Sequence, residues 1–202
     1  MKKSWQLFLL LVLSFLCVIA PAQTVLAAEG LAIQAQACIL LDGNNGRVLY
    51  EQEADKQWYP ASTTKLMTLV LALEAVENGT VSLEDIVSTS EYAASMGGSQ
   101  VYLYAGETRT LHEMLLGIAV GSGNDASVAV AEFIAGSNEA FVAKMNEKAK
   151  ELGMTGTHFM NPHGLHDPDH YTTAADMGKL AYYAIQEMCI RDSLCTRCSR
   201  IS

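Results

Sequence analysis

Hydrophobic residues gather most densely in the second quarter of the chain, where their pattern predicts a buried helix. Residues 66–76 read LMTLVLALEAV; Pro60 suits the first turn of this helix and Gly79 suits its end. Apolar residues on most sides of a helix indicate that it is buried. Ser62 and Lys65 open this helix, and a lysine at the mouth of a buried helix needs a chemical reason.

Two further apolar segments predict helices that flank a polar loop. Thr110 and Glu113 form a capping box that opens the stretch LHEMLLGIAV. The stretch leads into the polar loop GSGNDAS, and a second buried helix then extends to Gly136.

The rest of the pattern predicts two more helices and a hairpin. Ser137 can cap the amphipathic segment NEAFVAKMNEKAKELG, and Thr173 with Asp176 can start a last helix that ends near Gln186. Near the N-terminus, the stretches ACILLD and RVLYE flank the turn GNNG, which predicts a β-hairpin before the first helix.

The first 28 residues have the layout of a secretory signal peptide. Two lysines precede a mostly apolar stretch over residues 7–20, and the small residues around VLAAE predict cleavage after Ala27 or Ala28. A membrane anchor is the alternative, but the apolar stretch is short for a span and no basic cluster follows it. We therefore expect an exported protein that works outside the cytoplasmic membrane.

The composition changes abruptly after Gln186. The last stretch, EMCIRDSLCTRCSRIS, holds three arginines and three cysteines without clear periodicity, and its C-x-x-C has no partner pair with metal-ligand spacing. We interpret residues 187–202 as the product of a frameshift or an assembly artefact, with a genuine short tail as the alternative. Residues 29–186 are then one partial domain.

The charge balance excludes one class of partner. The chain of 202 residues has 13 basic and 22 acidic residues, a net charge of −9, and loss of the signal peptide removes two lysines and no acids. A nucleic-acid-binding surface requires a basic patch, so we expect no nucleic-acid partner.

The spacing of Ser62 and Lys65 suggests nucleophilic catalysis. Residues three apart lie on one face of a helix, so the two side chains can touch. Burial disfavours the ammonium and lowers the lysine pKa, which makes a neutral amine available to take the serine proton. A single S-x-x-K also arises by chance, and a lysine can extend out of a core, so the pair alone is a weak signal.

A second element strengthens the hypothesis. The loop residues Ser122, Gly123 and Asn124 can present a hydroxyl and an amide between two helices, although serine and asparagine also cap helices. With these motifs in this order, residues 35–186 resemble the serine-type D-alanyl-D-alanine carboxypeptidases, which are low-molecular-weight penicillin-binding proteins. The stretches that carry the resemblance include YPASTTKLMT, GSGNDASVAVAEFIAG, NPHGL and YTTAADM.

The resemblance implies a fold and a set of roles. The fold would be mixed α/β (α+β), with an antiparallel sheet flanked by helices and an all-helical lobe, incomplete at the C-terminus. Ser62 would be the acylated nucleophile and Lys65 its general base, Ser122 would relay a proton to the leaving amine, and Asn124 would bind the peptide. The implied partners are the peptidoglycan stem pentapeptide and, as covalent inhibitors, β-lactam antibiotics. No cofactor or metal is implied.

One part of the family pattern has no counterpart in the sequence. The K-T-G motif that lines the cleft in the family appears nowhere in these residues. The family's later strands, second domain and membrane-associating C-terminal helix are also missing, so we expect a truncated chain that lacks part of the site and its membrane association. Two alternatives therefore stay open beside the carboxypeptidase: a β-lactamase or esterase of the same superfamily, and an inactive penicillin- or peptidoglycan-binding fragment.

The histidines allow a different reading. Four histidines and two aspartates cluster in one loop, as zinc ligands can; the histidines are His158, His163, His166 and His170. The loop lacks the paired helical spacing of a zinc motif, so we expect no metal site there.

Overall fold

The computed structural model describes residues 33–187. The predicted signal peptide and residues 188–202 of the predicted tail lie outside this range, as do the cysteines of that tail. No helix among the described residues is both long and apolar enough to cross a membrane.

The predicted hairpin is confirmed. Strands β1 (Cys38–Leu41) and β2 (Val48–Gln52) pair antiparallel, with Cys38 opposite Gln52 and an irregularity after Leu40. The Asp42 carboxylate closes the turn because it accepts hydrogen bonds from the backbone of Asn44 and the side chain of Asn45.

A second small sheet was not predicted from the sequence. Strands β3 (Ile86–Ser88) and β4 (Thr108–Thr110) pair antiparallel although residues 89–107 separate them. The described residues therefore hold two separate two-stranded sheets. Strands of three residues are too short to show a clear alternation of apolar and polar side chains.

The predicted helices are present, with two changes at their ends. The first begins with a 3-10 turn, η1 (Ala61–Thr64), so Ser62 lies in that turn and Lys65 starts the α-helix proper. The predicted loop GSGNDAS shortens to two residues, since the helix after it already begins at Asn124. The predicted helices are α2 (Lys65–Glu77), α4 (Leu111–Gly121), α5 (Asn124–Ala135), α6 (Asn138–Glu151) and α7 (Ala174–Glu187). The short helix α3 (Glu91–Ala94) was not predicted.

The helix caps are those that the sequence predicted. Thr110 and Glu113 form the complete capping box of α4, and the Ser137 side chain accepts a hydrogen bond from the backbone of Ala140 at the start of α6. At the start of α7, Thr173 accepts one from the Asp176 backbone. Each cap satisfies a backbone donor that the helix itself leaves free.

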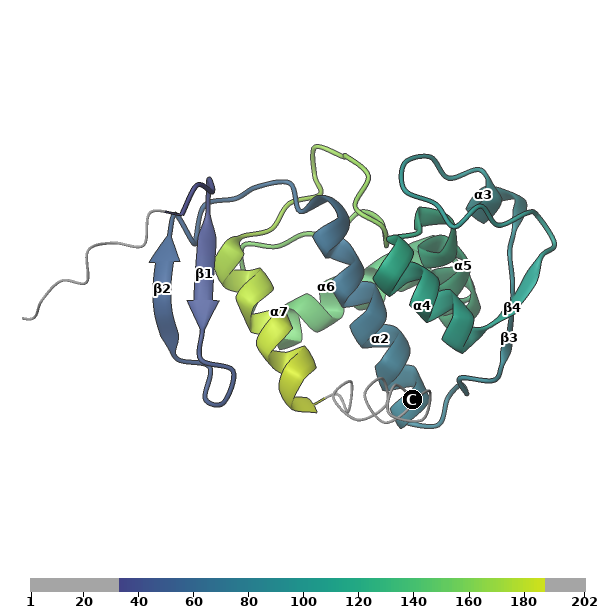
Figure 1. The fold of residues 1–202 in the computed structure, drawn as a ribbon, viewed down its shortest axis with the longest axis horizontal. Coiled ribbons are helices and arrows are strands. Elements are labelled where there is room, and N and C mark those ends of the chain that lie inside the picture. The colour runs from purple at the N-terminus through teal and green to yellow at the C-terminus, as the bar shows by residue number, and fades with distance from the viewer. Residues whose placement is uncertain (1–32, 188–202) are drawn as a thin grey trace, which may run out of the picture. The chain divides into compact units, whose positions relative to one another are not determined.

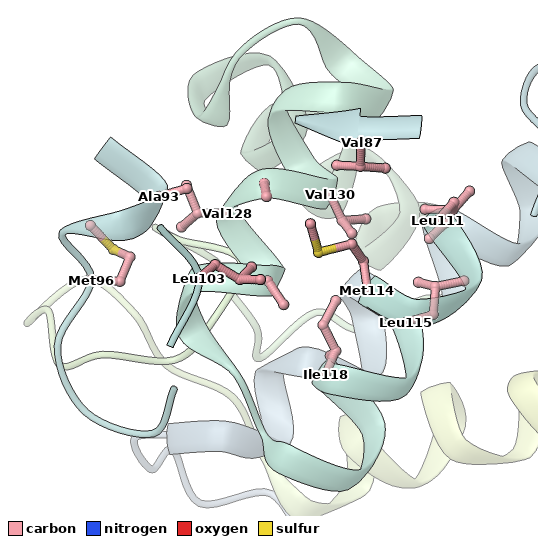
Figure 2. Packing of buried hydrophobic residues seen from close by; sticks show 13 residues of the cluster. Val87, Ala93, Met96, Leu103, Leu111, Met114, Leu115, Ile118, Val128 and Val130 are labelled. Carbon is pink, nitrogen blue, oxygen red and sulfur yellow. The ribbon is translucent and has the colours of Figure 1, made fainter. Parts of the chain in front are cut away.

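Helix α2 is the centre of the arrangement. It contacts α4 and α5 on one side and α6 and α7 on the other, while α7 also packs against β1 (Figure 1). Buried side chains form two clusters. One joins α4 and α5 to β3 and the loop before β4 (Figure 2), and the other joins α2, α6 and α7. Leu73 of α2 and Ile134 of α5 pack against both clusters, so α2 and α5 connect the two.

The segment before β4 is an irregular loop. Its two tyrosines, Tyr102 and Tyr104, are 76% and 77% exposed. Leu103 between them is buried in the first cluster. Tyr102 has the left-handed backbone conformation, with φ of 61°, so the chain turns at this residue.

Candidate active site

The structure brings Ser62 and Lys65 together, as their spacing predicted. Lys65 Nζ lies 3.3 Å from Ser62 Oγ. Ser62 is exposed on the 3-10 turn, whereas Lys65 is 3% exposed at the start of α2. The hydroxyl is thus open to solvent while the amine beside it is not.

Two buried acceptors hold the lysine amine in place. Asn124 Oδ1 lies 2.6 Å from Lys65 Nζ, and the backbone oxygen of His163 lies 2.7 Å from it. Burial lowers the pKa of Lys65 to about 8, against a smaller raising effect of the Asp125 carboxylate. Near neutral pH, part of the Lys65 population is therefore the neutral amine.

The three contacts match the valence of a neutral amine. Such an amine has two N–H donors and one lone pair. The donors serve Asn124 and His163, whose oxygens can only accept, and the lone pair then faces the Ser62 hydroxyl. Loss of one proton from the ammonium thus leaves a base that points at the serine.

Asn124 is fixed from its other end. Its Nδ2 donates to the backbone oxygen of Gly97 at 2.6 Å, so Oδ1 is the atom that faces Lys65. From the sequence, Asn124 was expected to bind the peptide, and its contact with the lysine was not predicted.

Ser122 lies next to this network. It is the C-cap of α4, half-buried, with φ of 53° in the left-handed region. Within residues 33–187, its hydroxyl takes no part in the hydrogen bonds that join Ser62, Lys65 and Asn124.

The loop that supplies the His163 carbonyl packs tightly on the serine turn. The Thr68 hydroxyl donates to the Pro162 backbone oxygen at 2.6 Å. Gly164 has φ of +91°, and a Cβ there would lie 1.8 Å from the Ala61 backbone oxygen. Only glycine allows this approach, which places the His163 carbonyl against Lys65.

The histidines of this loop have a structural role. Met160 N–H donates to His170 Nδ1 at 2.9 Å, so His170 Nε2–H is the donor toward Thr64 Oγ1 at 2.8 Å. Burial is the main reason why the pKa values of His163 and His170 fall to about 4. The part of the chain that the structure describes has no group of three side chains able to hold a metal ion.

A serine hydroxyl beside a buried amine of lowered pKa is the chemical signature of an enzyme that forms a covalent intermediate on serine. The comparisons agree with this class. Residues 22–197 match the family model for D-alanyl-D-alanine carboxypeptidase, Peptidase_S11, and the chain belongs to that family.

Individual relatives give the same picture. The D-alanyl-D-alanine carboxypeptidase DacF of Bacillus subtilis is 53% identical over 151 residues, which cover 75% of this chain and 39% of the relative. The crystal structure of DacD from Francisella tularensis is 39% identical, with a TM-score of 0.76 over 78% of this chain and 38% of that one. Penicillin binding protein 5 from Haemophilus influenzae is 35% identical with the same TM-score, over 78% of this chain and 47% of that one.

These matches confirm the predicted mixed α/β fold of the penicillin-binding DD-peptidases. The chain spans only about two fifths to one half of the length of these relatives. The activity of the whole protein is therefore a matter for proposal.

Proposed function

We propose that this chain belongs to a serine DD-carboxypeptidase that removes the terminal D-alanine from peptidoglycan stem pentapeptides. The observation that carries the proposal is the exposed Ser62 hydroxyl 3.3 Å from a buried Lys65 amine whose two N–H groups are already occupied. Family membership supports the choice of substrate, since relatives of known name are D-alanyl-D-alanine carboxypeptidases.

In the proposed acylation, the Ser62 oxygen attacks the carbonyl carbon of the D-Ala-D-Ala bond while its proton passes to Lys65. The tetrahedral intermediate collapses when the C–N bond breaks, and the departing D-alanine amine takes the proton from Lys65 by way of Ser122. The remaining peptide is then an ester on Ser62. A water molecule attacks that ester and gives a proton to Lys65; the C–O bond to Ser62 breaks, the acid is released, and Ser62 takes the proton back from Lys65.

Asn124 would have two tasks in this scheme. Its Oδ1 orients the lysine amine before reaction, and the resemblance to the family implies that Asn124 also hydrogen-bonds the bound peptide. β-Lactam antibiotics would acylate Ser62 in place of the peptide, as the name of the penicillin-binding relative suggests. The proposed substrate implies a site outside the cytoplasmic membrane, in the cell envelope, as does the predicted signal peptide.

The test uses the complete protein, because the relatives extend well beyond the part that this chain matches. A fluorescent penicillin should label the protein covalently, and D-alanine should be released from a D-Ala-D-Ala peptide. Ser62→Ala should abolish both, while Ser95→Ala, which changes another exposed serine, should abolish neither. Labelling that persists in Ser62→Ala would exclude the proposed nucleophile. Rapid turnover of the β-lactam without release of D-alanine would favour a β-lactamase.

A further inference from the structure

The mechanism above leaves unused a buried carboxylate directly beside the site. Asp125 follows Asn124 in the first turn of α5 and is 1% exposed. A buried carboxylate is unfavourable unless hydrogen bonds compensate for the lost water. The hydrogen-bond partners of Asp125 show which part of the molecule it holds in place.

Asp125 binds the backbone of a distant loop. Its oxygens accept from Val101 N at 3.1 and 3.2 Å and from Leu103 N at 3.0 Å. The residue between these two amides is Tyr102, in the left-handed conformation that side chains rarely adopt. The carboxylate therefore fixes the loop where its backbone is least favourable.

The same loop orients Asn124. The backbone N–H of Asn124 donates to the Ser99 oxygen at 2.8 Å, and its side chain donates to the Gly97 oxygen at 2.6 Å. At Gly98, φ is +79° and a Cβ would lie 2.8 Å from Asn124 Nδ2, so the backbone lies directly against the amide. A displaced loop would release the amide whose other end holds Lys65.

Asp125 also acts on Lys65 through space. Its negative charge raises the pKa of Lys65 in opposition to burial. The other groups that face the amine are the Ser62 hydroxyl, the Asn124 amide and the His163 carbonyl. The pKa of the His163 ring is lowered mainly by burial and, to a smaller extent, by the charge of Lys65. Asp125 is thus the anionic side chain that influences the base.

We propose that Asp125 is a positioning residue of this site: it fastens residues 101–103 at the start of α5, so that residues 97–99 hold Asn124 toward Lys65, and its negative charge acts on the Lys65 amine. Its importance for the reaction rests on the proposed function. The hydrogen bonds of Asp125 and its charge effect on Lys65 do not depend on the proposed function, so both can be measured without a substrate.

The chain offers a matched control. Asp176 is also a buried carboxylate in the first turn of a helix, α7, and it also binds a loop, through Gly156 N at 2.8 Å and the Thr157 hydroxyl at 2.9 Å. None of its hydrogen bonds involves Lys65. Asp176 Oδ1 also pairs with Lys179 Nζ at 2.8 Å, so Asp176→Ala removes a loop anchor and this ion pair without removing any contact to Lys65.

The experiment follows Lys65 by NMR of the full chain labelled with carbon-13 at the lysine Cε, with the signal assigned by its absence from Lys65→Arg. In Asp125→Asn, which keeps the shape, we expect the midpoint of the Lys65 titration to move to lower pH. In Asp125→Ala, the amide hydrogens of Val101 and Leu103 should in addition exchange about tenfold faster or more. Asp176→Ala should leave the Lys65 midpoint unchanged.

Each outcome bears on the proposal. An unshifted midpoint in Asp125→Asn, or an equal shift in Asp176→Ala, would overturn the charge effect. Unchanged exchange at Val101 and Leu103 in Asp125→Ala would overturn the anchoring. Penicillin labelling of the complete protein is a separate readout. If it fails in the unaltered protein while the NMR shifts appear, the proposed function fails and the assignment of Asp125 stands.

Discussion

Lys65 has to be a neutral base and also has to be hydrogen-bonded while it is buried. Burial favours the neutral amine, and a neutral amine is what a serine nucleophile needs as its base. A buried amine also requires partners for its N–H groups, which Asn124 and the His163 carbonyl supply. The same contacts that make burial tolerable therefore aim the lone pair at Ser62.

The state of the Lys65 amine should control the rate of acylation. We expect the rate of penicillin labelling to rise with pH and to reach half its maximum near the Lys65 pKa of about 8. Lys65→Arg should label at least ~100-fold more slowly, because a guanidinium stays protonated and cannot act as the base. Lys144→Arg, on an exposed face of α6, is the control that should keep the full rate. A Lys65→Arg variant with an unchanged rate would exclude the lysine as base.

The proposed catalytic side chains could be predicted from the sequence, but the backbone group that contacts Lys65 could not. Ser62 and Lys65 were predicted from their spacing, and the structure brings them together. The His163 carbonyl could not be predicted, since a main-chain oxygen carries no residue type. The contact between Asn124 and Lys65 was also missed, because it joins residues 59 positions apart.

Between the elements, the loop of residues 160–170 packs against the turn η1 and the start of α2. Three hydrogen bonds join the loop region to η1 and α2, from Lys65 to His163, from Thr68 to Pro162 and between Thr64 and His170. The close approach of Gly164 to Ala61 makes these bonds possible. The position of the nucleophile thus depends on a loop a hundred residues later in the chain.

A methyl group at residue 164 should separate the loop from the turn. Gly79 provides the comparison, because its φ of +74° is also left-handed but open space surrounds it. Gly79→Ala should lower the free energy of unfolding by about 1 kcal/mol, the cost of the backbone conformation alone. Gly164→Ala should cost about 2 kcal/mol more, since the Ala61 backbone has to move.

Urea unfolding followed by circular dichroism measures both variants. Equal losses at residues 79 and 164 would mean that the contact with Ala61 contributes nothing to stability.

The elements themselves were largely predictable. Long segments of helical period and their caps identified α2, α4, α5, α6 and α7, and the GNNG turn identified the hairpin. The loop with Tyr102 and Tyr104 could not be predicted, because its shape depends on hydrogen bonds to Asp125, more than twenty residues away. Short irregular segments are decided by such distant contacts, which a local pattern does not contain.

For the whole molecule, buried neutral histidines link stability to pH. The pKa values of His163 and His170 in the folded protein, about 4, lie below the ordinary value of 6.5. Between these values the unfolded chain binds more protons than the folded one, so protonation favours unfolding. Their contribution is complete above about pH 6.5 and is lost as the pH falls toward 4.

The free energy of unfolding should therefore fall between pH 6.5 and pH 4, by on the order of 2 kcal/mol for each histidine. His170→Gln, which keeps a donor and an acceptor, should make this fall less steep, whereas the exposed His166→Gln should leave its slope unchanged. Urea titrations at several pH values give the slope directly. A His170→Gln curve parallel to that of the unaltered protein would show that His170 does not titrate in this range.

Because Ser62 is exposed and Lys65 is buried, the serine affects how protons exchange between the Lys65 amine and solvent. Of the three groups that contact the Lys65 amine, Asn124 and His163 are buried and Ser62 is exposed. Protons travelling between the amine and bulk water by way of these contacts must therefore pass the serine hydroxyl. A bulky group attached to the Ser62 oxygen would obstruct this proton transfer. Ser62 therefore controls the access of protons to Lys65 and is also the group that Lys65 deprotonates.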